Sequence, residues 1–223
     1  MNLIEYADDE MLAIDLANRL AGELKATLDH EDRALFVVPG GTSPGPVFDD
    51  LCDADLDWSR VDVMLSDERW VPEVHVRSNT RMIRERLLVG RAAKANYLPL
   101  YARAETPEAV LAELETYIIP RLPIAVLLLG MGEDMHTASL FPGADNLELA
   151  LDRHAPVLVA MQAPDAPEPR VTLSARVLND AMSKHLIVTG SAKRAALDRA
   201  QSLPVEKAPV RAVLEDMNVY YCK

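Results

Sequence analysis

The feature of this sequence that most constrains its fold is a series of short apolar runs separated by helix-compatible stretches. The runs are Ala34–Val38, Val61–Leu65, Ile124–Leu129 and His185–Thr189. A continuous apolar run of this length is typical of a strand buried on both faces of a sheet. Between the runs, helical spacing of apolar residues predicts helices at 9–28, 78–88, 106–122 and 191–200. Strands that alternate with helices predict an α/β fold with helices on both faces of a mostly parallel sheet.

Residues that favour helix starts stand where the predicted helices begin. Each predicted helix begins next to a side chain that is able to cap it, namely Asp8, Ser78, Thr106 or Ser191. A first strand is predicted at Leu3–Ala7, and a further helix begins near Pro44. In parallel sheets ligands bind beyond the carboxyl ends of the strands, so the loops after the apolar runs are the places to search for chemistry.

Length and charge exclude several classes of protein. The 223 residues fit a single domain over 1–223. The formal net charge of −12 disfavours a nucleic-acid partner, because such binding requires Lys and Arg to neutralise phosphates. No apolar window reaches the ~18 residues of a membrane span, and Met1–Glu5 lacks a signal-peptide pattern, so we expect no membrane partner and a cytoplasmic location. Cys52 and Cys222 have no partner at CxxC spacing, which makes a disulfide framework or a zinc site improbable.

The loop after the run at Ala34–Val38 has the composition of an anion site. Gly40 and Gly41 allow a ligand to approach the backbone closely, and Thr42 and Ser43 add hydroxyl donors just before a predicted helix. Free N–H groups at a helix N-terminus bind phosphate. An ordinary strand-to-helix turn with hydroxyl caps explains the same residues equally well. The Walker A pattern is absent, since no Gly-Lys-Ser/Thr follows.

Charged residues follow the next run, at Ser66–Pro72. Arg69 stands beside two carboxylates, Asp67 and Glu68. Such an arginine is expected to be held in a charge network, where it can orient a substrate or stabilise developing negative charge. A solvated turn is the alternative.

The stretch 130–143, after the run at Ile124–Leu129, carries the most chemistry. Asp134 and His136 are two residues apart, close enough for the carboxylate to orient the imidazole. Three other interpretations stay open. A dinucleotide-binding turn is disfavoured because Met135 stands where its third glycine belongs. Metal binding by this pair lacks an evident third ligand. The third alternative is a histidine that only caps a helix, without a catalytic role.

Two basic residues later in the chain complete the set of candidates. Arg170 opens the segment 170–174, and Lys193 lies in the first turn of the helix predicted at 191–200. A cation there opposes the helix dipole, which indicates an anion nearby, although surface lysines are common at such positions. The proline-rich acidic segment 163–169 is predicted to be a surface loop beside the site. His30, His75, His154 and His185 lie at expected helix ends, in loops or at strand starts, without a polar constellation nearby, and are assigned no role.

Taken together, these loops resemble the 6-phosphogluconolactonase family, which shares a superfamily with the glucosamine-6-phosphate isomerases. The matching segments follow in order along the chain at 39–44, 66–72, 78–80, 130–143, 170–174 and 190–193. The resemblance implies a three-layer Rossmann-like α/β fold. It also implies hydrolysis of 6-phospho-D-glucono-1,5-lactone in the oxidative pentose phosphate pathway, with neither metal nor organic cofactor. The partner is expected to be a small-molecule phosphosugar lactone, and the protein is expected to be a monomer or small homo-oligomer.

By the same resemblance, His136 is the general base for water, Asp134 supports it and Arg69 holds or polarises the lactone. Substrate binding is expected at Gly40, Gly41, Thr42, Asp67, Arg170 and Lys193, with the phosphate on Gly41, Thr42, Arg170 and Lys193. The chain departs from the family pattern at Met135, where glycine is usual, and methionine does not easily adopt a positive φ.

Two rival functions remain. The isomerases carry a glutamate shortly after the histidine of this motif, whereas 136–143 contains no acidic residue. Their first loop also reads Asp-Glu-Tyr in place of Asp67-Glu68-Arg69, so both differences favour the lactonase. The other rival is a sugar-phosphate sensor that binds without turnover. No Gly-x-Ser-x-Gly elbow is present, which disfavours a covalent serine route.

Overall fold

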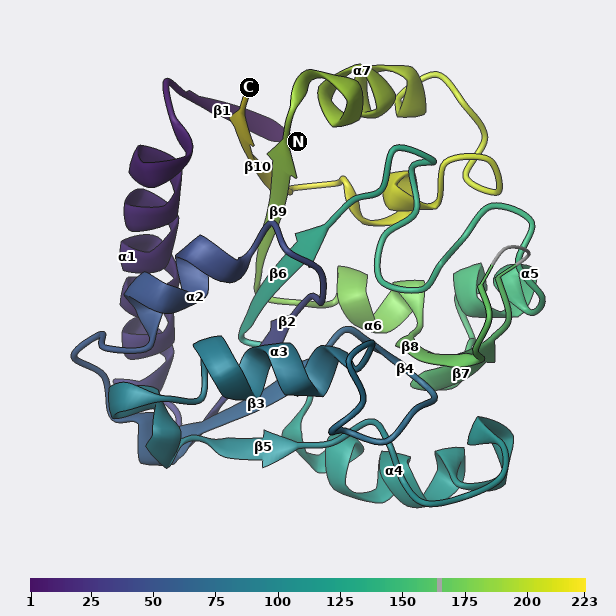
Figure 1. Cartoon of the computed structure of the whole chain (residues 1–223), viewed down its shortest axis with the longest axis horizontal. Helices are drawn as coiled ribbons and strands as arrows, with labels where there is room; N and C mark the ends of the chain where they lie inside the picture. Colours follow the sequence, from purple (N-terminus) through teal and green to yellow (C-terminus); the bar gives the residue numbers. More distant parts are fainter. Residues whose placement is uncertain (164–165) are drawn as a thin grey trace.

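A seven-stranded parallel sheet forms the centre of the protein in the computed structural model, which describes residues 1–163 and 166–223 (Figure 1). The strands lie in the order β1 (Asn2–Tyr6), β10 (Asn218–Cys222), β9 (Ser183–Thr189), β6 (Val126–Gly130), β2 (Ala34–Val38), β3 (Val61–Leu65) and β5 (Asn96–Leu98). Every neighbouring pair in this sheet is parallel. All residues of β2 and β3 are buried, as their apolar character predicts.

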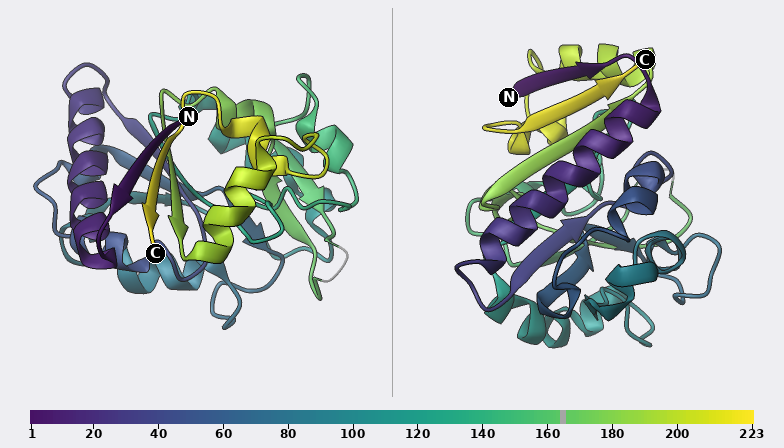
Figure 2. Two further views of the ribbon diagram at one scale, coloured as in Figure 1. Left: turned by 90° about the horizontal axis from the view of Figure 1, so that it is seen from above. Right: turned by 90° about the vertical axis from the view of Figure 1, so that its left-hand side faces the viewer.

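Helices cover both faces of this sheet. They are α1 (Asp9–Leu28), α2 (Gly45–Leu51), α3 (Asn79–Arg86), α4 (Leu111–Ile118), α5 (Leu147–Leu151), α6 (Ala175–Asn179) and α7 (Ser191–Ala200). Figure 2 places α1 on one side of the sheet and α7 on the other. The prediction of a three-layer α/β fold with a mostly parallel sheet is therefore confirmed. None of the helices in the described part of the chain is both long and apolar enough to cross a membrane.

Helix boundaries agree with the predictions except at one helix and two caps. The helix α1 has the predicted bounds, and Asp8 accepts a hydrogen bond from the Met11 backbone N–H at 2.8 Å. The predicted helix 106–122 is instead α4 with one 3-10 turn before it and one after it. The backbone of Val110 is not helical, with φ −130° and ψ 2°, and Pro120 cannot continue an α-helix beyond Ile118. Ser78 caps α3, whereas Thr106 makes no cap bond and Ser191 lies inside α7, after Gly190.

A second, antiparallel sheet is present that was not predicted from the sequence. It consists of β4 (Asp67–Arg69), β8 (Arg170–Leu173) and β7 (Leu158–Met161). Ser66 joins it to the main sheet, since the Ser66 N–H donates to Val38 at 2.8 Å and the Ser66 carbonyl accepts from Leu173 at 2.9 Å. This sheet therefore holds Asp67, Arg69 and Arg170 at the carboxyl ends of β2 and β3.

His185 was expected to have no polar constellation around it, but the structure places it among polar groups from distant parts of the chain. Its side chain is fully buried, with Nε2 2.7 Å from Glu23 and Nδ1 3.0 Å from the Tyr220 hydroxyl. Ser183 also donates to Glu23, at 2.6 Å. Glu23 comes from α1, far away in the sequence, so only the fold brings these groups together.

Candidate active site

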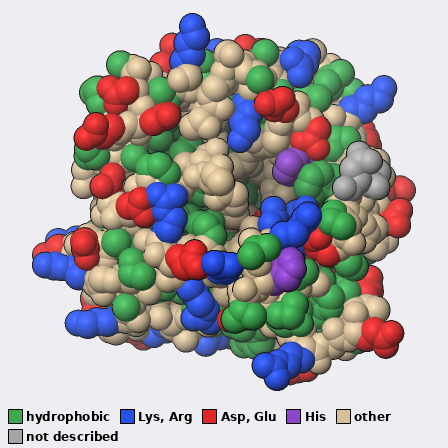
Figure 3. All heavy atoms as spheres, viewed as in Figure 1, with side chains coloured by type: hydrophobic (Ala, Val, Ile, Leu, Met, Phe, Trp, Pro, Cys, Tyr) green, Lys and Arg blue, Asp and Glu red, His purple; other side chains and the backbone are tan. Residues whose placement is uncertain are grey.

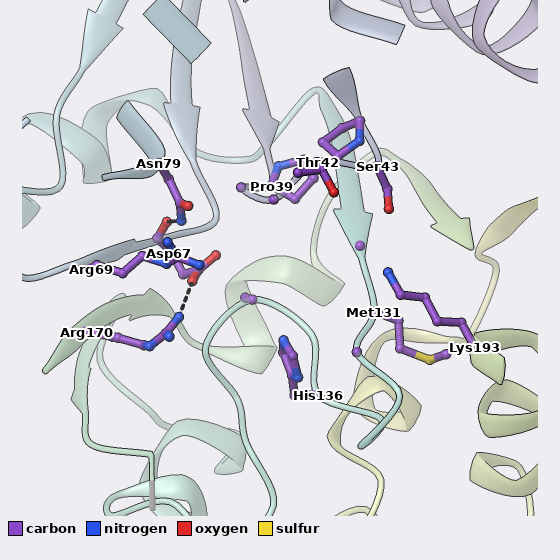
Figure 4. A pocket seen from close by; sticks show the side chains of 16 residues that line it. Pro39, Thr42, Ser43, Asp67, Arg69, Asn79, Met131, His136, Arg170 and Lys193 are labelled. Atoms are coloured by element: carbon purple, nitrogen blue, oxygen red, sulfur yellow. Dashed lines mark hydrogen bonds and ion pairs between the residues drawn. The ribbon is translucent and has the colours of Figure 1, made fainter. Parts of the chain in front are cut away.

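A pocket of about 250 Å³ opens beyond the carboxyl ends of β2, β6 and β9 (Figure 4). In the space-filling view the middle of this face is hollowed, with histidine and Lys or Arg side chains around the hollow (Figure 3). The pocket brings together eight of the nine residues that the sequence analysis singled out: Gly40, Gly41, Thr42, Asp67, Arg69, His136, Arg170 and Lys193. The ninth, Asp134, lies behind His136 and lines a neighbouring hollow of about 340 Å³.

His136 and Asp134 form a hydrogen-bonded pair. The Nδ1 atom of His136 lies 2.5 Å from Oδ1 of Asp134, and the backbone N–H of His136 donates to the same oxygen at 3.2 Å. Burial opposes ionisation of Asp134, but the hydrogen bonds from His136 outweigh it and hold the pKa of the carboxyl below its ordinary value. The ionised carboxylate accepts Nδ1–H, so Nε2 keeps its lone pair for a proton from the pocket.

Gly132 provides the room for this pair. A Cβ atom at this position would lie 2.3 Å from Cε1 and Nδ1 of His136 and 2.4 Å from Oδ1 of Asp134. Because these distances are far below van der Waals contact, only glycine fits here without displacing the imidazole. Gly132 is thus explained by the histidine and not by a dinucleotide, whereas a Cβ at Gly130 would meet no atom within 4 Å.

Asp67 and Arg170 face each other on the side of the pocket formed by the small sheet. The Asp67 carboxylate accepts hydrogen bonds from Ser139 at 2.6 Å and Ser66 at 3.1 Å, and Arg170 Nη1 is 3.9 Å away. Burial lowers the pKa of Arg170, and the Asp67 charge partly offsets this. Among the described residues Arg170 Nε has no hydrogen-bond partner, so the guanidinium retains donors for an anion.

The loop 39–44 and Lys193 form the rest of the wall. Gly41 has a φ of +85°, a conformation that favours glycine, while Gly40 lies against the Asn79 side chain so closely that a Cβ would be 2.1 Å from Oδ1. Ser43 Oγ is 3.1 Å from Thr189 Oγ1, which fastens the loop to the end of β9. Lys193, from the first turn of α7, reaches the pocket from the side opposite Arg170 in Figure 4.

Comparison with known proteins identifies the family. A family described as glucosamine-6-phosphate isomerases/6-phosphogluconolactonase matches residues 7–221. The chain belongs to this family. Its sequence is 45% identical over 203 residues to a 6-phosphogluconolactonase of Pseudomonas aeruginosa, covering 89% of this chain and 85% of the relative. It is 40% identical over 225 residues to one of Pseudomonas putida, covering 98% and 91%.

A solved structure of the family has almost the same fold. The 6-phosphogluconolactonase of Shewanella baltica superposes with a TM-score of 0.96 at 32% identity, covering 99% of this chain and 97% of that one. A monomeric glucosamine-6-phosphate deaminase shares the fold, with a TM-score of 0.81 at 16% identity. The resemblance inferred from the sequence, and the prediction of an enzyme of this family, are confirmed.

Met135, the departure from the family pattern, adopts the conformation that glycine would favour. Its φ is 66°. The Met135 carbonyl accepts from the Val210 N–H at 3.0 Å, its own N–H donates to Gly132 at 3.0 Å, and the side chain packs against the core. These contacts hold the strained backbone in place, so methionine does not prevent the Asp134–His136 geometry.

Arg69 is held differently from the prediction. Its Nη1 donates to the Arg77 carbonyl at 2.6 Å, and within the described residues it forms no ion pair with either flanking carboxylate. Glu68 points away from the pocket, as alternation along β4 requires. Buried there, with a raised pKa, it accepts hydrogen bonds from the backbone N–H groups of Asn79 and Thr80, both at 2.8 Å. Arg69 therefore lines the pocket without an ion-pair partner in the part of the chain that the structure describes.

Several pocket residues were not identified as site residues from the sequence. Asn79 lines the pocket and donates to the Asp67 carbonyl at 3.0 Å, and its segment 78–80 was noted only as a family match. Met131 and Ala138 also line the wall, but nothing in their spacing distinguishes them, and Ser43, which the sequence analysis named as a hydroxyl donor of the first loop, lines it too. Of the predicted loop 163–169, Pro164 and Asp165 lie outside the described residues, while Ala163, Ala166 and Pro167 line the hollow beside Asp134.

Proposed function

We propose that this family member hydrolyses 6-phospho-D-glucono-1,5-lactone to 6-phosphogluconate. The observation that carries the proposal is a histidine whose Nδ1 is bonded to a carboxylate while its Nε2 remains available beside three basic side chains. The two ends of the substrate demand this combination, because an ester needs a base and an oxyanion site, and a phosphate needs cations and N–H donors. The names of the relatives support the same reaction.

The reaction proceeds in two proton transfers at His136. Nε2 takes a proton from water as the water oxygen bonds to the lactone carbonyl carbon, and the carbonyl oxygen becomes an oxyanion. Asp134 stabilises the imidazolium that forms, and Arg69 stabilises the oxyanion. The intermediate then collapses, the bond to the ring oxygen breaks, and the imidazolium returns its proton to that oxygen. A positioned base of this kind contributes about 10²–10⁴-fold.

The rest of the pocket binds and orients the substrate. The phosphate lies against Gly41 and Thr42, between Lys193 and Arg170, which approach from opposite sides of the pocket. Gly40 holds the loop close to Asn79, and Asp67 orients Arg170. The route uses neither a metal nor a cofactor. A cytoplasmic location, and action as a monomer or small homo-oligomer of one domain, stay predictions.

The test measures loss of freshly generated 6-phosphoglucono-δ-lactone, coupled to 6-phosphogluconate dehydrogenase, with spontaneous hydrolysis subtracted. Wild type, His136→Ala and His154→Ala are compared after circular dichroism shows that each is folded. His154 is exposed and outside the pocket, so it controls for loss of a histidine. Turnover that collapses only in His136→Ala supports the proposal. Equal rates in all three refute the role of His136, and absence of turnover in wild type points to the sensor or to isomerase chemistry.

A further inference from the structure

Phe141 contacts two groups of the active site although it does not line the substrate pocket. Its ring centroid is 4.0 Å from that of His136, with 26° between the planes, so the two rings are stacked. The Arg170 guanidinium carbon lies 5.0 Å from the same phenyl centroid, within the range of a cation–π contact. One side chain thus touches both the histidine and the arginine of the site.

The position of Phe141 is fixed by the turn that follows His136. The Leu140 N–H donates to the Thr137 carbonyl at 3.0 Å, and Ala138 within this turn has a φ of 49°. Ser139 is fully buried and donates to Asp67. The chain therefore reverses directly after His136, and this reversal brings the Phe141 ring back onto the imidazole.

The stacked ring leaves the imidazole little freedom. His136 lines the substrate pocket, whereas Phe141 lines the neighbouring hollow, so the phenyl covers the side of the imidazole turned away from substrate. Gly132 lies against the Cε1–Nδ1 edge, and Asp134 accepts from Nδ1. Rotation about the Cβ–Cγ bond would break the stack and the hydrogen bond together.

We propose that Phe141 is a positioning residue that keeps His136 Nε2 directed at the substrate. This inference rests on the proposed function and deepens it. Asp134 alone fixes one atom of the imidazole and leaves the ring plane free to tilt about the hydrogen bond, whereas the phenyl face fixes the plane. The Phe141–Arg170 contact sets the distance between the base and an anion-binding group, because the same ring supports both.

The kinetic test compares Phe141→Leu and Phe141→Met, which keep an apolar side chain but lose the flat ring, with Phe141→Tyr, which keeps it. Tyr221→Leu is the matched control, because it removes a half-buried ring with its own arginine contact, Arg194 at 5.7 Å, outside the pocket. We expect kcat to fall about tenfold in the Leu and Met variants, with KM changing less than about threefold, since small misplacements act on the chemical step. Phe141→Tyr and Tyr221→Leu keep the wild-type kcat. A wild-type kcat in a folded Leu or Met variant, or a loss in Phe141→Tyr equal to that in Phe141→Leu, overturns the proposal.

A second measurement does not depend on turnover. Nitrogen NMR of the His136 ring reports which nitrogen carries the proton. We expect one tautomer in wild type and in Phe141→Tyr, with the proton on Nδ1, and averaged signals in Phe141→Leu. If wild type lacks lactonase activity but shows this difference, the proposed function fails while the positioning role stands. Identical ring spectra in wild type and Phe141→Leu refute the positioning role whatever the activity.

Discussion

Substitution of Gly132 by alanine tests whether the active site depends on the close contact between this backbone and the His136–Asp134 pair. The new Cβ would lie 2.3 Å from Nδ1 and 2.4 Å from the Asp134 oxygen, so it would occupy the place of the hydrogen bond itself. Real Cβ contacts essentially never fall below 3.0 Å, so the imidazole must move by at least about 0.7 Å. A misplacement near 1 Å costs about 10²-fold in rate, which is about 2.7 kcal/mol of transition-state stabilisation.

We therefore expect kcat of Gly132→Ala to fall about 10²-fold in the coupled lactone assay. Its KM should change little, because the loop 39–44 and Lys193 are untouched. Gly22→Ala is the control, since Gly22 lies in α1, far from the pocket, and a Cβ there meets no atom within 4 Å. Wild-type kcat in Gly132→Ala, or an equal loss in Gly22→Ala, would refute the steric reasoning.

Three further predictions follow from the same structure. In urea denaturation, the free energy of unfolding of Met135→Gly should be about 1 kcal/mol larger than that of Met135→Ala, because only glycine relieves the strain at a φ of 66°. Equal stabilities of the two variants would exclude that strain. Burial opposes ionisation of Asp62, but hydrogen bonds from Arg33 and Asn96 outweigh it and lower its pKa, so its stabilisation is complete above about pH 4 and is lost as the pH falls through the folded-state pKa. Asp62→Asn should lower the free energy of unfolding by ~2 kcal/mol at pH 7, which is less than the loss expected for a fully buried ion pair, because Arg33 is 43% exposed. The free energy of unfolding of this variant should also fall less steeply than that of wild type as the pH drops below about 4. An unchanged slope there contradicts the prediction. Lys193→Met should raise KM for the phosphorylated lactone about tenfold and leave KM for glucono-δ-lactone unchanged. An equal rise in KM for both lactones would refute a contact between Lys193 and the phosphate.

Five of the seven strands of the main sheet were predictable because their apolar runs carry their own signal, whereas β5 and β10 were not predicted from the sequence. In β2 and β3 every residue is buried, so the apolar run and the strand coincide. The small sheet was not predictable, since β4 consists of the three charged residues Asp67, Glu68 and Arg69. Strand structure there depends on pairing with β8, which comes about a hundred residues later in the chain.

The site was predictable where the chemistry lies within one loop. Spacing alone pairs Asp134 with His136, and the structure places them in hydrogen-bond contact. Contacts between distant segments were not predictable. The Glu68 carboxylate was expected to hold Arg69 but is bound by the start of α3, and the Phe141 stack depends on a turn whose φ values sequence pattern does not report.

The pocket draws its walls from segments that begin at Pro39 and end at Lys193. On the proposed function, a sugar phosphate that bridges the loop 39–44, Arg170 and α7 would act as a reversible crosslink between distant parts of the chain. A ligand bound in this way would oppose detachment of these segments, so at concentrations well above Kd its occupancy would add to the free energy of unfolding in proportion to the logarithm of ligand concentration. Supply of the proposed substrate would then also raise resistance to proteolysis, and the protein is expected to persist longest where that metabolite is abundant.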